Sequence, residues 1–313
     1  MPIWADPSDR YLKGQGMGEI LQFMINALSL GGLYALMALG LALVYSILRL
    51  VNFAYGELVM VGGYTLLVVG QAAAIPWLIV AALAIFVAVV TSLLLERVAF
   101  RPVRHASATT MLITSFAVSV LLQNAALLLV SPRPQAVRIP SFFVENIRMG
   151  ELLIAKSHLV TTIVSLVLLG LLTLFLKRTI LGSALRAAAD DFVMTRLLGI
   201  RANRVIATAF AISGALAGVV SLFWIGRSAS VIPQIGLTPV LVAFVASVIG
   251  GMGSLTGAVV GGYVLGFVTV TLNTFLPQAF LDFRQAFVFA VVILVLLLRP
   301  QGLVRRAQAT ERI

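Results

Sequence analysis

The segment NFAYGELVMVGGY (residues 52–64) places a carboxylate in a run that is otherwise apolar enough to cross a bilayer. A charge at membrane depth costs roughly 2.5–3.5 kcal/mol on insertion scales, so a chain usually keeps one there for a pathway, a site or a pairing contact. Unwound backbone is tolerated at that depth only where it lines a cavity or is buried in protein. We therefore expect Asn52, Tyr55, Gly56 and Glu57 to form a broken-helix segment inside a membrane bundle.

Two roles are open for Glu57. In the first, it is a fixed charge or hydrogen-bond acceptor that lines a translocation route. In the second, it is a structural acceptor that holds the turn of a broken helix through backbone N–H groups. Asn52 could satisfy freed backbone groups in the same turn. Both roles place this segment in the interior of the bundle.

A second group of glycines interrupts the apolar sequence near residue 250. Gly250, Gly251 and Gly253 end a short run at 239–252, where we expect another broken segment on the translocation route. Gly-interrupted segments in matching halves of a chain point to a transporter's binding region and to inverted repeats. The tetrapeptide VGGY occurs twice, at 61–64 and 260–263. Close helix packing through small residues is the alternative explanation for Gly253, Gly257 and Gly261.

Catalytic chemistry finds no support in the sequence. There is no cysteine and no phosphate-binding loop of the G-x-x-x-x-G-K-[ST] type. His105 and His158 stand outside any His/Cys/Asp/Glu cluster, so we expect no metal site and no cofactor. No catalytic set lies within the apolar runs. The sequence therefore argues against an enzyme, and we expect any ATP hydrolysis on a separate subunit.

Composition identifies the elements that must position these residues. Of the 313 residues, 61% are hydrophobic and 11% are charged, against about 25% charged in soluble domains. No polar stretch is long enough for a separate domain, so residues 1–313 form one transmembrane domain. We predict an all-α polytopic membrane protein with about 8–10 transmembrane helices, including broken or re-entrant segments, and with an inverted repeat suggested by the glycines. The expected spans lie near 20–44, 51–70, 76–96, 110–130, 158–176, 205–225, 239–252, 255–276 and 284–298.

Loop charges orient the spans. Of the 22 basic residues, 14 fall on one side if the loops at 45–50, 97–109 and 177–204 share it with the C-terminal tail. The positive-inside rule makes that side cytoplasmic. The net charge of +11 then reflects topology rather than nucleic-acid binding. Residues 131–157 form the long external loop, expected to be irregular or short-stranded, either as a solvated connector or as a docking surface for an external partner.

The cytoplasmic loop at 177–204 contains an amphipathic pattern. Apolar residues recur at spacings of three and four, which predicts a helix over Ser183–Leu198. Asp190 and Asp191 lie toward its middle, and Gly199 is its expected stop. The helix either lies on the bilayer surface or fits its apolar ridge into a groove of a cytoplasmic partner. The ridge residues are Leu185, Ala188, Ala189, Phe192, Val193, Leu197 and Leu198.

Four blocks of sequence together resemble the permease of branched-chain amino-acid ABC importers. They occur in the family's order and reach from about residue 25 to residue 303. The blocks are Gly31–Tyr64, Leu185–Ser221, Val240–Gly266 and Val291–Leu303. The family's NFA-x-GE motif falls on Asn52, Phe53, Ala54, Gly56 and Glu57, with Tyr55 where members often have His.

The resemblance implies partners and a location that composition does not show. A second, homologous permease subunit, two cytoplasmic ATPase subunits and a periplasmic substrate-binding protein would complete an importer in the bacterial inner membrane. It would carry branched-chain or similar amino acids. A cytoplasmic helix engages the ATPase in such importers, and the match puts that role on Leu185–Gly199. Related permeases carry urea and short amides, and a self-sufficient secondary transporter or channel is the alternative from another class.

Overall fold

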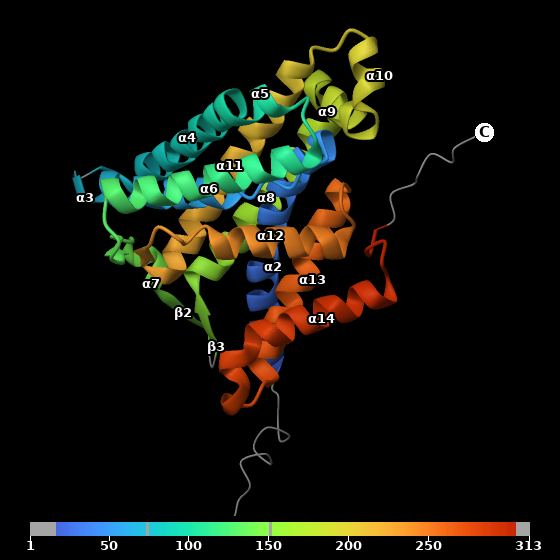
Figure 1. Cartoon of the computed structure of the whole chain (residues 1–313). Helices are drawn as coiled ribbons and strands as arrows, with labels where there is room; N and C mark the ends of the chain where they lie inside the picture. The colour runs from blue at the N-terminus through green and yellow to red at the C-terminus, as the bar shows by residue number, and fades with distance from the viewer. Residues whose placement is uncertain (1–16, 73–74, 150–151, 305–313) are drawn as a thin grey trace, which may run out of the picture.

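The computed structural model describes residues 17–72, 75–149 and 152–304 (Figure 1). Fifteen of the nineteen described elements are helices, and the four strands have two to four residues each, which confirms the predicted all-α class. The helices and strands in chain order are α2 (Met17–Leu48), α3 (Tyr55–Ala72), α4 (Trp77–Leu95), the π-helix η1 (Glu96–Phe100), α5 (Arg101–Val103), α6 (Ala108–Leu129), β1 (Gln135–Ala136), α7 (Ser141–Val144), β2 (Asn146–Met149), β3 (Leu152–Ala155), α8 (Lys156–Arg178), α9 (Ile180–Asp190), α10 (Phe192–Leu197), α11 (Ala202–Ser228), β4 (Ser230–Val231), α12 (Leu237–Gly250), α13 (Leu255–Phe275), the 3-10 helix η2 (Gln278–Phe283) and α14 (Arg284–Leu298).

All nine predicted spans correspond to helices, in two length classes. Within the described parts of the chain, seven helical segments are long and apolar enough to cross a membrane. The spans expected at 51–70 and 239–252 form the shorter helices α3, of 18 residues, and α12, of 14 residues. A full span needs about 20 residues, so α12 crosses only part of a bilayer. This confirms the expected short segment before Gly250.

Helices approach one another most closely where glycines lie at their interfaces. On α13, Gly262 lies against the main chain of Ala35, and Gly266 lies against the main chain of Gly31, both on α2. On α11, Gly214 and Gly218 approach α4 in the same way. Lipid tails are as apolar as leucine, so such close approach and its dispersion energy replace the hydrophobic effect in holding membrane helices together.

Two groups of four helices make the same pattern of contacts. The pattern is kept when α2 is exchanged with α11, α3 with α12, α4 with α13 and α6 with α14. The first group is α2, α3, α4 and α6, and the second is α11, α12, α13 and α14. α2 packs on α13 as α11 packs on α4, and α2 packs on α12 as α11 packs on α3. α3 contacts α6 as α12 contacts α14, while contacts between α2 and α11 and between α3 and α12 join the two groups. A repeated four-helix unit would produce this arrangement.

The recurring tetrapeptide VGGY does not mark that exchange. Its first copy is on α3, where Gly62 lies against Ser221 of α11. Its second copy is on α13, where Gly262 lies against Ala35 of α2. Since α3 exchanges with α12 and not with α13, the two copies are not equivalent. Close packing accounts for both.

The two ends of the bundle differ in structure. Figure 1 shows α9 and α10 at one end and α7, β2 and β3 at another. The strands are short: β1 pairs antiparallel with β4, and β2 pairs antiparallel with β3. Residues 131–149 and 152–157 therefore form the short-stranded segment predicted for the long loop. α8 and α11 run between this end and the α9–α10 hairpin.

Candidate functional site

Two helix N-termini meet inside the bundle. α3 begins at Tyr55 and α12 begins at Leu237, and a glycine stands at each start. A Cβ added to Gly56 would overlap the carbonyl of Gly236, and a Cβ added to Gly236 would overlap the carbonyl of Gly56. Only glycine allows main chains to come this close. Helix N-termini carry unpaired N–H groups and partial positive charge, so this junction is a polar spot in apolar surroundings.

Glu57 ties the junction to α6. Its Oε1 accepts hydrogen bonds from Ser119 Oγ and from Gln123 Nε2, both at 2.8 Å. Its side chain is fully buried, and Oε2 has no hydrogen-bond partner in the described part of the chain. Because Ser119 lies halfway along α6, the contact puts the junction near the middle of that span. The observed partners are side chains of another helix rather than the backbone N–H groups expected for a structural acceptor.

Sequence reasoning missed the two partners of Glu57. Ser119 and Gln123 lie 62 and 66 residues further along the chain. One signal was available, because two polar residues spaced by four on an apolar span share one face of the helix. That spacing is typical of a polar contact to a neighbouring helix.

Asn52 and Tyr55 lie in the turn at the start of α3, just before Glu57. Asn52 is 2% exposed, and its Oδ1 has no partner within the described residues. Its main-chain carbonyl accepts from Tyr55 N at 3.2 Å, which forms the turn before α3. The ring of Tyr55 is buried and fills the notch that Gly40 leaves in α2. Tyr55 therefore has a packing role here.

The glycines at 250–253 lie apart from this junction. They follow α12, whose 14 residues separate the two groups by about 21 Å. The glycines at 250–253 therefore form a second break, at the other end of α12 from the junction. Gly250 packs against the main chain of Gly257, while Gly251 and Gly253 have φ of 107° and 90° and turn the chain into α13. The C-terminal segment covers this turn: Leu303 N donates to Ile249 O at 2.8 Å, and Val304 N donates to Gly250 O at 3.1 Å.

The loop at 177–204 contains two helices where one was predicted. α9 ends at Asp190, and Asp191 begins α10 as its N-cap, with its side chain accepting from Met194 N at 2.9 Å. Aspartate prefers such caps to helix interiors because its carboxylate satisfies a free N–H group. Gly199 follows α10 with φ of 83° and confirms the predicted stop.

The split divides the predicted apolar ridge into two unlike parts. Leu185 and Ala189 on α9 are buried at 2% and 8% exposure, against the protein's own helices. They cannot face a partner, which corrects the prediction for them. Leu197 and Leu198 at the end of α10 are each 75% exposed, and Val193 is 68% exposed. Of the predicted ridge, the exposed apolar part therefore lies on α10.

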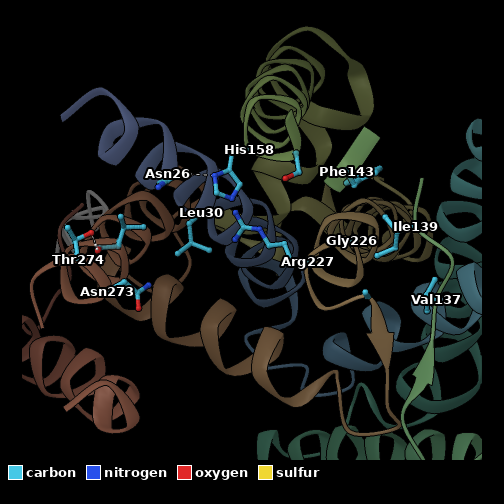
Figure 2. A pocket seen from close by; sticks show the side chains of 13 residues that line it. Asn26, Leu30, Val137, Ile139, Phe143, His158, Gly226, Arg227, Asn273 and Thr274 are labelled. Atoms are coloured by element: carbon cyan, nitrogen blue, oxygen red, sulfur yellow. Dashed lines mark hydrogen bonds between the residues drawn. The ribbon is translucent and has the colours of Figure 1, made fainter. Parts of the chain in front are cut away.

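A polar cavity of about 760 Å³ opens at the other end of the bundle (Figure 2). His158 Nδ1 and Asn26 Oδ1 are 2.6 Å apart, and Arg227 Nη2 donates to Ser29 Oγ at 3.3 Å. No motif in the sequence connects His158 with Arg227, because they lie on different helices, α8 and α11. The residues that line the cavity are Asn26, Leu30, Val137, Ile139, Phe143, Ser157, His158, Gly226, Arg227, Ala229, Val270, Asn273 and Thr274.

Known proteins are similar to this chain over most of its length. A family model described as branched-chain amino acid transport system / permease component matches residues 23–296. The chain is 38% identical to the high-affinity branched-chain amino acid transport system permease protein BraD of Pseudomonas aeruginosa, over 93% of this chain and 97% of BraD. It is 36% identical to the corresponding protein LivH of Escherichia coli (strain K12), over 93% of this chain and 97% of LivH.

A shorter similarity links the chain to a differently named permease. It is 32% identical to the permease protein LivM of Salmonella typhimurium, over 44% of this chain and 32% of LivM. No solved structure matches the chain. The family model and the BraD and LivH similarities each extend over most of the sequence. The chain therefore belongs to the family of branched-chain amino acid transport system permease components.

Proposed function

We propose that this chain is the membrane-spanning permease subunit of an ATP-driven importer that carries branched-chain or similar amino acids across the inner membrane. One observation carries the proposal, namely the similarity to curated permeases along 93% of the chain. The shorter similarity to LivM supports pairing with a second, homologous permease subunit. A periplasmic binding protein would deliver the substrate from outside.

The energy source in this proposal lies on separate subunits. The sequence has no phosphate-binding loop, so two ATPase subunits would dock from the cytoplasm. The surface that suits them is the exposed row of α10, which includes Val193, Leu197 and Leu198. Asp190 and Asp191 border this row, and Asp191 fixes where α10 begins. The charge bias of the loops supports a cytoplasmic hairpin and C-terminus.

The translocation route in this proposal passes the junction of α3 and α12. Discontinuous helices whose N-termini meet near the middle of a membrane are typical of transporter pathways. Asn52, Gly56 and Glu57 would shape the route there. Since Glu57 Oε1 is already engaged by two side chains of α6, its proposed role is to position helices rather than to recognise substrate. Gly250, Gly251 and Gly253 would form the hinge at the other end of α12.

Reconstitution in liposomes tests the proposal. The permease would be reconstituted with its partner permease, ATPase and binding protein, and uptake of labelled leucine, valine, urea and short amides would be measured with and without ATP. ATP-dependent uptake of the amino acids is the expected result, and an ATPase with a disabled phosphate-binding loop is the control. Uptake by this chain alone on an ion gradient would instead show a secondary transporter. Uptake of urea or short amides in place of amino acids would show that these compounds are the substrates.

A further inference from the structure

The polar cavity lies at the end of the bundle opposite the α9–α10 hairpin. α11 runs 27 residues from Ala202 beside the hairpin to Ser228 beside the cavity, a length of about 40 Å. With the hairpin in the cytoplasm, the cavity faces the side from which a binding protein would deliver substrate. Its volume of about 760 Å³ is in the range of small-molecule sites, roughly 300–1,000 Å³.

Arg227 is the charged group of this cavity with capacity to bind a ligand. A guanidinium carries five N–H donors, and the structure shows one hydrogen bond from Arg227, to the buried hydroxyl of Ser29. In the described segments of the chain, no carboxylate lies within 4.0 Å of Arg227, because the one ion pair found there joins Lys156 and Glu145. A guanidinium matches a carboxylate in shape and charge and binds it through two parallel hydrogen bonds.

Polar and apolar residues both surround the guanidinium of Arg227. Figure 2 shows its guanidinium directed toward His158 and Leu30, with Asn273 and Thr274 further along that side and Val137 and Ile139 on the other. Asn273 is held in place by Arg284, whose Nη1 donates to its Oδ1 at 2.6 Å. This second guanidinium adds positive potential near the cavity. Leu30 and Val270, whose carbonyl accepts from Thr274 Oγ1, are the apolar lining residues on the guanidinium side.

We propose that this cavity is a binding site, within the permease itself, for aliphatic carboxylates with a short branched chain. Arg227 holds the carboxylate, and Leu30 and Val270, on the side to which the guanidinium points, hold the branched chain. The inference rests on the proposed function, because branched-chain amino acids are members of this ligand class. It goes further by assigning a permease residue to substrate recognition before translocation.

The lining residues also predict that the site binds the amino group of a ligand weakly. Among the described lining residues there is no Asp or Glu to pair with an ammonium group. Thr274 Oγ1 already donates to Val270 O at 3.0 Å, so its lone pairs offer an ammonium group an uncharged acceptor and no ion pair. The site therefore recognises the carboxylate strongly and the amino group weakly. Removing the amino group of leucine should cost little affinity, whereas neutralising its carboxylate should cost much.

Direct binding tests this inference. The permease–ATPase complex, in nanodiscs and without the binding protein, would be titrated with labelled L-leucine in competition with 4-methylpentanoate and L-leucinamide. We expect 4-methylpentanoate to compete within about fivefold of leucine and leucinamide to compete at least about tenfold more weakly, as for loss of a charge-assisted contact. Arg227→Gln should weaken leucine binding by about tenfold or more. The matched control is Arg133→Gln, at an exposed arginine outside the lining.

Three results would overturn the inference. The first is wild-type affinity for leucine in Arg227→Gln, with the complex intact by size-exclusion chromatography. The second is equal competition by leucinamide and leucine. The third is weaker docking of the ligand-free binding protein in Arg227→Gln with leucine binding unchanged, because Arg227 would then be a protein contact. ATP-driven uptake separates the two proposals: uptake without direct binding removes only this site, while absence of amino-acid uptake by the wild type removes the proposed function as well.

Discussion

Arg49 donates a hydrogen bond from Nη2 to the main-chain carbonyl of Ala189, at 3.3 Å. Arg49 directly follows α2 and has a left-handed backbone with φ of 54°. Ala189 lies in the last turn of α9, where a cation is favourable beside the free carbonyls. The contact joins the proposed ATPase-docking hairpin to the segment at 49–54 that leads into the junction of α3 and α12. The hydrogen bond therefore links the hairpin and this segment directly.

The variant Arg49→Gly removes this hydrogen bond and keeps the left-handed backbone at residue 49. Glycine adopts a left-handed backbone freely, whereas other residues lose about 1–2 kcal/mol there, so Arg49→Gly should retain or raise thermal stability in detergent. We expect uptake of leucine to fall severalfold while ATP hydrolysis continues. The measurement is the number of ATP molecules hydrolysed per leucine imported. An unchanged ratio in Arg49→Gly would show that the hydrogen bond transmits nothing.

Glu57 should tolerate an isosteric amide better than truncation. Glu57→Gln keeps an oxygen acceptor for Ser119 and Gln123, so we expect uptake within about threefold of wild type. Glu57→Ala leaves buried donors unsatisfied, which costs about 1–3 kcal/mol. Thermal unfolding in detergent and uptake assays measure the two effects. If Glu57→Gln abolishes uptake without loss of stability, the charge itself is needed on the route.

Glycines in α13 and α8 form a matched pair of tests for close packing. A Cβ on Gly261 would overlap the carbonyl of Ala246 on α12, whereas a Cβ on Gly170 would meet no atom within 4 Å. Gly261→Ala should destabilise the protein by roughly 1–3 kcal/mol through overpacking. Gly170→Ala should be neutral or stabilising by about 0.5–1 kcal/mol, because alanine is the better helix former. Unfolding in mixed micelles gives both values, and equal behaviour would argue against the α12–α13 contact.

The two halves of the predicted ridge should respond differently to a charge. Leu197→Asp lies on the exposed face of α10 and should change stability by no more than about 0.5 kcal/mol. It should still abolish copurification of the ATPase subunits. Leu185→Asp places a charge in the core and should destabilise the protein by about 4 kcal/mol or more. Retained ATPase binding in Leu197→Asp would locate the docking surface elsewhere.

The Glu145–Lys156 ion pair should make the short-stranded end of the bundle sensitive to acid. The hydrogen bond from Lys156 and the positive charge of Lys156 hold the pKa of the Glu145 carboxyl below its ordinary value of 4.5. A lowered pKa means that the unfolded segment binds more protons, so the contribution to stability is complete above pH 4.5 and is lost as the pH falls through the lowered pKa. Amide exchange at Lys156, whose N–H donates to Glu145 O at 3.0 Å, would show this. Glu145→Gln should remove the pH dependence, and its persistence would assign it to another group.

The sequence predicted the spans well and the polar contacts poorly, for a physical reason. Hydrophobic runs are local, so length and composition suffice to find a helix such as α8 or α11. The pairing of Glu57 with Gln123, or the meeting of His158 and Arg227 in one cavity, depends on which helices become neighbours. The break at Asp191 was a local signal, since aspartate favours caps over helix interiors, but the apolar periodicity on both sides obscured it.

The junction of α3 and α12 limits how sequences of this kind can vary. Gly56 and Gly236 touch through carbonyl and main-chain atoms, so neither position has a side chain left to shorten. A larger residue at one of them cannot be compensated by a smaller residue at the other. Drift can alter the apolar residues around the crossing point, but at the point itself any added atom must move two helix starts apart.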